Sequence, residues 1–405
     1  MERLVLGLLA LVLALRYPVH FLLQPPFLMD FEVYRAVASR VLAGQGGALY
    51  APTTAGSDMM VFKYGPPWAL LWAPLGWLPQ PLAVAAWTMG SLAALIVTLA
   101  LAARCCRAAG LRPHPLLALP ATFLILRPLG EEMGNGQVNL LWAGLTVWAI
   151  WAVMRRRPWS AAGALAAAIL LKLPAAAYLP YLALRGQRRV AAATIAIMAA
   201  AVALSSAALA PAHPLQPALD WVQGLTRSGT SYAFVIGNQS ILALLGRLLT
   251  ADGHGLNIAA LPQAALPWLA LALLAVALAC IIAPAPRPHD SRRFLYDSAL
   301  LAAVMVLFSP SAWLATYAAL LFPAYVAGAG LAQPGARRDA PAWALAALVA
   351  ILVWFTHRKA WTLLGLTIWR GETYVFLVFM VLPWLGLALL ALLWRLRRRA
   401  AGRSA

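Results

Sequence analysis

Hydrophobic runs separated by short, arginine-containing turns make up most of the chain. About 20 apolar residues are enough for a helix to cross a hydrocarbon layer of roughly 30 Å. The pattern therefore predicts an all-α polytopic membrane protein with about 10 full transmembrane helices. We place them near residues 4–24, 82–103, 114–128, 137–154, 190–211, 262–284, 295–309, 312–331, 341–357 and 374–395.

Two hydrophobic stretches do not fit simple crossings. The run from Pro66 to Leu78 is short and interrupted by Pro74, so it predicts an interfacial segment of the first outer loop. The run from Trp159 to Leu184 has arginines at both ends, which allows either no crossing or two. It is too short for two full spans, so we predict a re-entrant pair of half-helices, broken near Lys172 and Pro174 and buried by protein.

The stretch from Phe27 to Gly44, just after the first run, predicts an amphipathic helix on the outer surface. Pro25 and Pro26 end the preceding helix. Apolar residues then recur at helical spacing, with the polar residues mostly elsewhere. The apolar set is Phe31, Tyr34, Val37 and Val41, and the polar set is Glu32, Arg35, Ser39 and Arg40.

Composition and charge give the orientation. The chain is 63% hydrophobic, with 11% charged residues and a mean hydropathy of +0.79, which excludes an ordinary water-soluble core. Its net charge of +19 comes from arginines between the hydrophobic runs, whereas a nucleic-acid binder needs them on one solvated face. The positive-inside rule then predicts cytoplasmic termini, outer loops at 25–81 and 212–261, and a basic tail at 395–405. The expected partners are membrane lipids and no nucleic acid.

This topology places most acidic residues outside. Four of the twelve are predicted to be cytoplasmic, namely Glu2, Asp290, Asp297 and Asp339. The other eight lie at or near the outer face, so we expect the chemistry there. The three cysteines have no disulfide or metal-ligand spacing. The first hydrophobic run lacks a small-residue cleavage site, which favours a retained span.

Asp30 stands at the first turn of the predicted outer helix, and two interpretations remain open. The carboxylate is an N-cap that accepts hydrogen bonds from free backbone N–H groups, or it is a functional group.

Several short motifs, in order, resemble glycosyltransferase family 87, a family of membrane enzymes of the GT-C type that use polyprenyl-phosphate-mannose. The resemblance covers most of the chain up to about residue 330. The motifs are Asp30-Phe31-Glu32-Val33-Tyr34, Gly44 and Tyr50, Phe62-Lys63-Tyr64-Gly65-Pro66, Ala73-Pro74-Leu75, Gly136-Gln137-Val138-Asn139, Lys172-Leu173-Pro174, Gly237-Asn238-Gln239-Ser240, and Ser309-Pro310 with Trp313.

The resemblance implies that Asp30 is the catalytic carboxylate, and elementary chemistry agrees. A base must take the proton from the acceptor hydroxyl as that hydroxyl attacks the anomeric carbon. The leaving group is a phosphate, a weak base that needs no general acid, so one carboxylate suffices, whereas an inverting glycosidase needs two. Glu32 lies on another helical face and is expected to position substrate or to face the surface.

The leaving phosphate needs cations, and Lys63 and Lys172 are candidates. A lysine inside an apolar run is costly, so Lys172 predicts function, although snorkelling or structural pairing remains open. Gln137 and Asn139 begin a span, where amides bind sugar hydroxyls or join helices. Asn238 and Gln239 form a similar pair at the end of the second outer loop. The full set of expected substrate-binding residues is Glu32, Tyr34, Lys63, Tyr64, Gln137, Asn139, Lys172, Asn238 and Gln239.

One position departs from the family. Family members often carry a histidine shortly after the Ser-Pro-x-x-Trp motif, but here Leu314, Ala315, Thr316 and Tyr317 follow Trp313. Loss of that histidine implies a different way of binding or a different substrate, and Tyr317 is a candidate replacement.

Together these features predict a single domain over residues 1–405. It would be a multi-pass GT-C glycosyltransferase, inverting, that transfers mannose from a polyprenyl-phosphate donor to a lipid or glycan acceptor outside the cytoplasm. No metal or other cofactor is expected. The abundance of arginine and alanine indicates a GC-rich bacterium and its plasma membrane. Two alternatives stay open: a transporter or flippase of a lipid-linked sugar, with essential charges near the midplane, and a non-catalytic subunit of an envelope complex.

Overall fold

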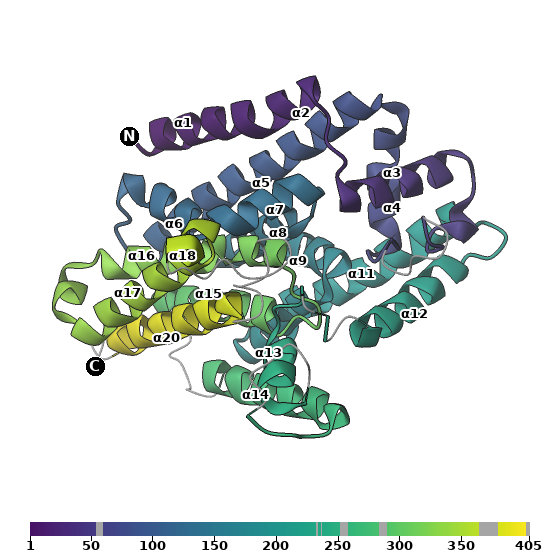
Figure 1. The fold of residues 1–405 in the computed structure, drawn as a ribbon. Coiled ribbons are helices and arrows are strands. Elements are labelled where there is room, and N and C mark those ends of the chain that lie inside the picture. The colour runs from purple at the N-terminus through teal and green to yellow at the C-terminus, as the bar shows by residue number, and fades with distance from the viewer. Residues whose placement is uncertain are drawn as a thin grey trace.

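The computed structural model is built of helices (Figure 1). It describes all residues except 54–59, 232–233, 236, 252–257, 283–289, 364–379 and 402–405, and the described residues contain no strand. The helices are α1 (Glu2–Ala14), α2 (His20–Leu23), α3 (Met29–Leu42), α4 (Pro66–Trp72), α5 (Gln80–Ala108), α6 (Ala118–Leu124), α7 (Leu126–Asn135), α8 (Asn139–Met154), α9 (Pro158–Leu171), α10 (Tyr178–Leu184), α11 (Arg188–Leu209), α12 (Gln216–Ser231), α13 (Ile241–Leu249), α14 (Leu266–Ile282), α15 (Ser291–Leu307), α16 (Leu321–Leu331), α17 (Ala340–Phe355), α18 (Arg358–Leu363) and α20 (Val381–Ala401).

The centre of the molecule is a row of packed helices in which α5 contacts α8, α8 contacts α9, and α9 contacts α11. Small residues allow these helices to approach closely. Gly144 of α8 faces α5, where an added Cβ would lie 3.2 Å from Thr98 Oγ1. A second group, in which α15 and α17 both pack on α20, lies beside this row (Figure 1).

Five helical segments of the described chain are long and apolar enough to cross a membrane. They are Glu2–Leu23, Gln80–Ala108, Arg188–Leu209, Gln263–Ile282 and Leu314–Leu331. The pair α7 and α8 makes a sixth if it is a single bent span. The predicted runs at 114–128, 295–309 and 341–357 form shorter helices, and the last predicted run begins in residues 374–379, outside the described part. The all-α membrane architecture is therefore confirmed, while the number of ten crossings stays a prediction.

The predicted re-entrant segment folds out and back. Helix α9 ends where Lys172 adopts an extended backbone, and Pro174 lies in a 3-10 turn, Leu173–Ala177, before α10. The two ends of the segment, Pro158 and Leu184, line the same cavity. Lys172, at its middle, reaches Asn139 at the start of α8. The 16 residues of α8 are about 24 Å long, so the break lies at the other end of the bundle from the cavity.

The first outer loop packs as two short elements on α3, as its interrupted hydrophobic pattern predicts. Helix α4 is followed by a 3-10 helix, Ala73–Trp77, and both contact α3. In α3 itself, Phe31, Tyr34 and Val37 are buried while Ser39 is exposed. The amphipathic helix is thus confirmed, while its place on the outer surface stays a prediction.

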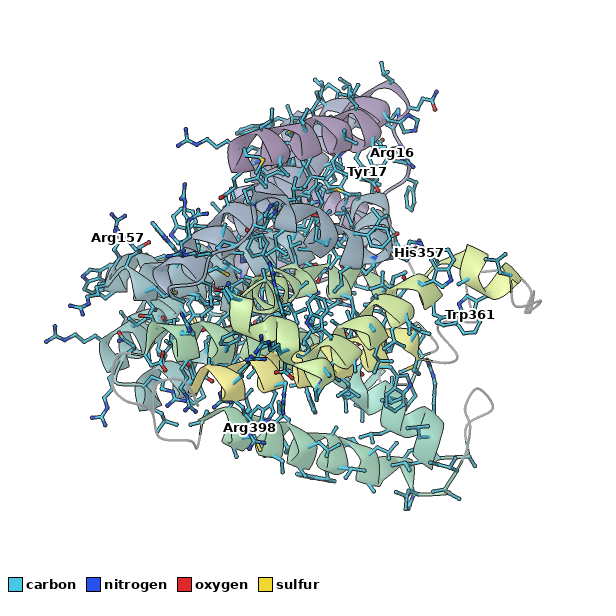
Figure 2. The ribbon with its side chains drawn as sticks, turned by 90° about the vertical axis from the view of Figure 1, so that its left-hand side faces the viewer. Arg16, Tyr17, Arg157, His357, Trp361 and Arg398 are labelled. Atoms are coloured by element: carbon cyan, nitrogen blue, oxygen red, sulfur yellow. The ribbon has the colours of Figure 1, made fainter. Side chains whose placement is uncertain are left out.

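The two ends of the bundle differ in the side chains they present. Figure 2 shows Arg157, from the turn between α8 and α9, at the opposite end of the molecule from His357 and Trp361. The fold therefore separates these two groups of side chains.

Candidate active site

Asp30 does not cap its helix. The N-cap residue of α3 is Leu28, which makes no side-chain cap hydrogen bond, so Asp30 is already inside the first turn. Its Oδ2 instead accepts a hydrogen bond from Gln137 Nε2, at the turn between α7 and α8. Asp30 remains partly exposed. The N-cap interpretation is therefore wrong, and the carboxylate is directed at a residue from a distant part of the chain.

The sharp corner between α7 and α8 explains how Gln137 reaches Asp30. The two helices meet at 115°. Gly136 ends α7 in the left-handed region at φ +68°, which glycine adopts without strain. An added Cβ at Gly136 would lie 2.6 Å from the Cβ of Phe31, beside Asp30. The corner therefore needs glycine both for its backbone and for its close approach to α3.

A chain of hydrogen bonds extends from Asp30 into the protein. Asn139 Nδ2 donates to Gln137 Oε1 over 3.2 Å and to Glu132 Oε2 over 2.7 Å. Lys172 Nζ donates to Asn139 Oδ1 over 2.5 Å. The structure thus brings together Asp30, Gln137, Asn139 and Lys172, all of them predicted site residues. We call these four residues, with Glu132, the polar cluster.

Glu132 is the member that sequence reasoning missed. Its residue is only 1% exposed, and its Oε1 accepts the backbone N–H of Leu140 over 2.9 Å. The neighbouring Glu131 points elsewhere and pairs with Arg127 at 3.0 Å. The sequence did contain a signal for the burial of Glu132. It lies three residues after Leu129 and one before Met133, which places all three on the buried face of the helix.

The Phe62–Pro66 motif brings Lys63 and Tyr64 to the same region. Gly65 N–H donates to Leu170 O over 2.8 Å, two residues before Lys172. A Cβ on Gly65 would lie 3.0 Å from the Leu170 side chain, so this contact also requires a small residue.

Burial and the two lysines act oppositely on the acidity of Asp30. Burial raises the pKa of Asp30 above its ordinary value, and the positive charges of Lys63 and then Lys172 oppose this rise, as does the Gln137 hydrogen bond. Burial likewise lowers the pKa of Lys63, and the Asp30 charge opposes that change. The site thus combines a carboxylate of raised basicity with cationic neighbours.

Aromatic rings form one wall beside Asp30. Tyr34 and Tyr64 share a hydrogen bond of 2.9 Å between their hydroxyls, and burial raises the pKa of both, so they stay protonated. The Tyr34 ring lies 4.7 Å from that of Trp72 and 4.8 Å from that of Trp87. Trp87 Nε1 also donates to Gly136 O over 2.9 Å, which ties this wall to the corner.

Glu32 and the pair Asn238 and Gln239, also predicted site residues, make the following hydrogen bonds, which lie outside the polar cluster. Glu32 accepts a 3.1 Å hydrogen bond from Gln80 in an exposed position. Asn238 is fully buried and holds the Ser309–Trp313 segment: its Nδ2 donates to Pro310 O and its Oδ1 accepts from Ala312 N. Gln239 is fixed beside it, since its carbonyl accepts the Tyr317 hydroxyl over 2.6 Å. In these contacts Asn238 and Gln239 bind a distant segment of the chain, and the Tyr317 hydroxyl donates to a backbone carbonyl.

The described part of the chain contains no group of three or more histidine, cysteine or acidic residues able to hold a metal ion.

Comparison with known proteins agrees with these motifs. Two curated mycobacterial proteins, each called a polyprenol-phosphate-mannose-dependent alpha-(1-2)-phosphatidylinositol mannoside mannosyltransferase, resemble the chain. The Mycobacterium tuberculosis protein is 31% identical over 195 residues, which is 44% of this chain and 45% of that protein. The Mycolicibacterium smegmatis protein is 31% identical over 242 residues, 55% of this chain and 53% of that protein. The chain thus spans about half the length of these relatives.

No solved structure gives a significant match to the chain. A sequence profile of glycosyltransferase family 87 matches residues 62–310, which is more than half of the chain. The matched range includes Lys63, Gly136, Gln137, Asn139 and Lys172 and begins after Asp30. On this match, the chain belongs to glycosyltransferase family 87.

Proposed function

We propose that this protein transfers a mannosyl group from polyprenyl-phosphate-mannose to a hydroxyl of a lipid or glycan acceptor, with inversion at the anomeric carbon. The observation that carries the proposal is the Asp30 carboxylate, held by Gln137 and flanked by the charges of Lys63 and Lys172. Family membership supports glycosyl transfer, and the printed names of both relatives support this donor.

Asp30 acts as the general base. The acceptor oxygen forms a bond to the anomeric carbon while the bond from that carbon to the phosphate oxygen breaks, and its electron pair stays on the phosphate. The acceptor proton moves to Asp30. Burial helps, because a carboxylate of raised pKa is a stronger base. Attack from the face opposite the phosphate inverts the configuration.

Lys63 and Lys172 stabilise the departing phosphate, on which negative charge grows in the transition state. Lys172 is fixed by its hydrogen bond to Asn139 and lies 5.8 Å from the centre of the Trp142 ring. Its ammonium keeps two further N–H donors for a phosphate oxygen. In this proposal the lysines neutralise the charge on the departing phosphate, while Asp30 takes the proton of the acceptor.

The amides Gln137 and Asn139 mainly orient the charged groups. Gln137 donates to Asp30 and accepts from Asn139, while Asn139 links Glu132 to Lys172. The sugar would then lie against Tyr64 and Trp87, the partly exposed rings of this wall, while the buried Tyr34 packs against both rings. Asn238 and Gln239 support this site through the Ser309–Trp313 segment.

We place the reaction on the outer face of a bacterial plasma membrane, with both termini in the cytoplasm. The arginine-rich turns at the far end of α8 and α9 support this orientation under the positive-inside rule. The carrier lipid in the donor requires a membrane location.

The test is sugar transfer by purified protein in liposomes. Radiolabelled polyprenyl-phosphate-mannose is the donor and a membrane extract supplies the acceptor. Wild type should transfer label, and Asp30→Asn should lower kcat by about 10²–10⁴ because the base is lost. Glu32→Gln is the matched control, since it removes a carboxylate from the same helix and should keep most activity.

Each contrary result has a definite meaning. Equal transfer by wild type and Asp30→Asn would remove Asp30 from the mechanism. Movement of the carrier between leaflets without transfer by wild type would overturn the glycosyltransferase proposal and favour a flippase. Size-exclusion elution of each variant shows whether it remains folded.

A further inference from the structure

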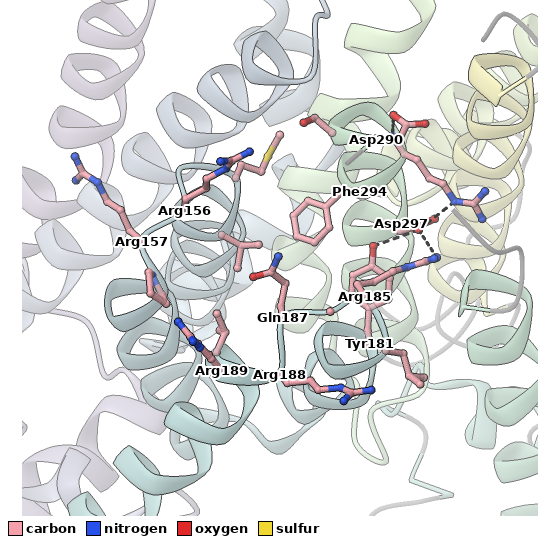
Figure 3. A pocket seen from close by; sticks show the side chains of 18 residues that line it. Arg156, Arg157, Tyr181, Arg185, Gln187, Arg188, Arg189, Asp290, Phe294 and Asp297 are labelled. Carbon is pink, nitrogen blue, oxygen red and sulfur yellow. Dashed lines mark hydrogen bonds and ion pairs between the residues drawn. The ribbon is translucent and has the colours of Figure 1, made fainter. Parts of the chain in front are cut away.

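A cavity of about 960 Å³ lies at the end of α8 and α9 away from the polar cluster (Figure 3). Three segments distant in sequence form it: the turn between α8 and α9, the turn between α10 and α11, and the start of α15. We call it the arginine pocket. The cations that line it are Arg156, Arg157, Arg185, Arg188, Arg189 and Arg293.

Positive charge exceeds negative charge in this pocket. Six arginines face two aspartates, Asp290 and Asp297. Asp290 accepts hydrogen bonds from the backbone N–H groups of Arg292 and Arg293 and so caps α15. Asp297, only 1% exposed, pairs with Arg185 at 2.9 Å and also with Arg397 at 2.9 Å. Both carboxylates are therefore occupied by the protein.

Asp297 pairs with two pocket arginines, Arg185 and Arg293, but some of their N–H groups have no hydrogen-bond acceptor among the described residues. Arg293 Nε lies 3.6 Å from Asp297 Oδ2, beyond hydrogen-bond distance. Arg293 Nε and Nη2 and Arg185 Nε are buried and have no hydrogen-bond partner among the described residues. The Arg185 side chain is only 9% exposed. Buried donors without acceptors are costly, so an anion that accepts from them stabilises the protein.

Helix ends add to the attraction for an anion. Pro158 begins α9 and Arg188 begins α11, and both line the pocket. Their N-cap residues, Arg157 and Gln187, make no side-chain cap hydrogen bonds. The positive ends of these helix dipoles therefore face the pocket without side-chain caps.

We propose that the arginine pocket is a binding site for a phosphate group, separate from the proposed catalytic site. Arginine suits this ligand because its planar guanidinium binds phosphate oxygens in pairs. From the sequence, the same arginines indicate only the orientation of the chain in the membrane. That role does not require them to line a cavity. The phosphate belongs either to the headgroup of an anionic lipid or to a soluble phosphate compound.

The test compares two pairs of consecutive arginines, one inside the pocket and one outside it. Arg188→Gln/Arg189→Gln changes exposed residues of the pocket, and Arg337→Gln/Arg338→Gln removes the same charge from exposed residues outside it. The protein is purified in detergent. One arm measures the unfolding temperature in inorganic phosphate against chloride at equal ionic strength. The other arm counts phosphatidic acid molecules retained in native mass spectrometry.

We expect wild type and the Arg337/Arg338 variant to bind, and the Arg188/Arg189 variant to lose about tenfold or more in apparent affinity. Loss in the first arm identifies a soluble phosphate ligand, and loss in the second alone identifies a lipid headgroup. Gln187→Glu, which adds a carboxylate and keeps every arginine, should weaken binding in the same arm. Equal behaviour of the pocket and control pairs in both arms would overturn the proposal.

Discussion

The polar cluster and the arginine pocket lie at opposite ends of α8 and α9, and each is built around one buried carboxylate. Glu132 and Asp297 are both 1% exposed. Glu132 is satisfied by an amide and a backbone N–H, and its link to Lys172 passes through Asn139. Asp297 forms direct ion pairs with Arg185 and Arg397 and accepts the Tyr181 hydroxyl. The difference decides what each end offers to a ligand.

At the polar cluster, the acids and the nearby cations balance. Asp30 and Glu132 of the cluster are matched by Lys172 within it and by Lys63 beside it, which suits the proposed reaction, in which the site must both accept a proton and hold a phosphate. At the arginine pocket the cations are in excess, which suits binding an anion without chemistry. We therefore propose different roles for the two buried carboxylates, because their immediate partners differ.

The largest expected effect is on the pocket's carboxylate. Asp297→Asn leaves the buried Arg185 and Arg397 without their counter-charge, and breaking a buried ion pair on one side costs about 3–5 kcal/mol in the free energy of unfolding. Chemical unfolding in mild detergent measures this. Asp290→Asn is the control, because asparagine caps a helix about as well as aspartate. An Asp297→Asn protein as stable as the control would mean that the arginines do not depend on Asp297.

A smaller effect is expected at the matching carboxylate of the polar cluster. Glu132→Gln keeps the shape and loses one acceptor, so we expect a cost of about 1–3 kcal/mol in stability. Transfer activity should fall as well, because Asn139 loses its anchor and releases Gln137 and Lys172. The control is Glu131→Gln, which removes a carboxylate from the same helix and affects a partly exposed pair with Arg127 and a hydrogen bond from Asn135.

The outcome for Glu132→Gln separates two roles. A fall in kcat with unchanged KM fits misplacement of the base, and a rise in KM alone fits weakened donor binding. Activity equal to that of Glu131→Gln would show that Glu132 does not support the site.

Much of the fold could be predicted, because apolar runs and helical periodicity are local signals. The outer helix α3, the interrupted loop and the fold-back at Lys172 all follow from proline and arginine positions. The number of crossings could not be settled in this way, since α6, α15 and α17, with 7, 17 and 16 residues, are shorter than the roughly 20 residues that a full crossing needs.

The site was predictable only in part, for physical reasons. Family resemblance pointed to Asp30, but the N-cap alternative stayed open because sequence places a helix start only to within one or two residues. Asn238 and Gln239 were grouped with Gln137 and Asn139 by residue type, yet the Asn238 side chain binds backbone groups of Pro310 and Ala312, and the Gln239 carbonyl accepts the Tyr317 hydroxyl. No local sequence pattern predicted the arginine pocket, because folding brings together the three distant segments that form it.

The smallest expected effect comes from changing the pH without changing any residue. It tests whether Asp30 accepts the proton. In the proposed mechanism transfer requires ionised Asp30, whose pKa is raised by burial. Activity should therefore fall with decreasing pH through a limb that lies above the usual aspartate range of about 4. Measuring kcat/KM against pH in liposomes locates this limb. Glu32→Gln should leave it unmoved.

Stability should respond to pH in the opposite sense to activity. A carboxyl group with a raised folded pKa binds its proton more tightly in the folded state, so its contribution to stability is present at low pH and is lost as pH rises through the folded pKa. Asp30→Asn should remove this dependence and should be at least as stable as wild type at neutral pH. A destabilised Asp30→Asn protein would show instead that the ionised carboxylate holds the corner at Gly136, and Asp30 would then be structural as well as catalytic.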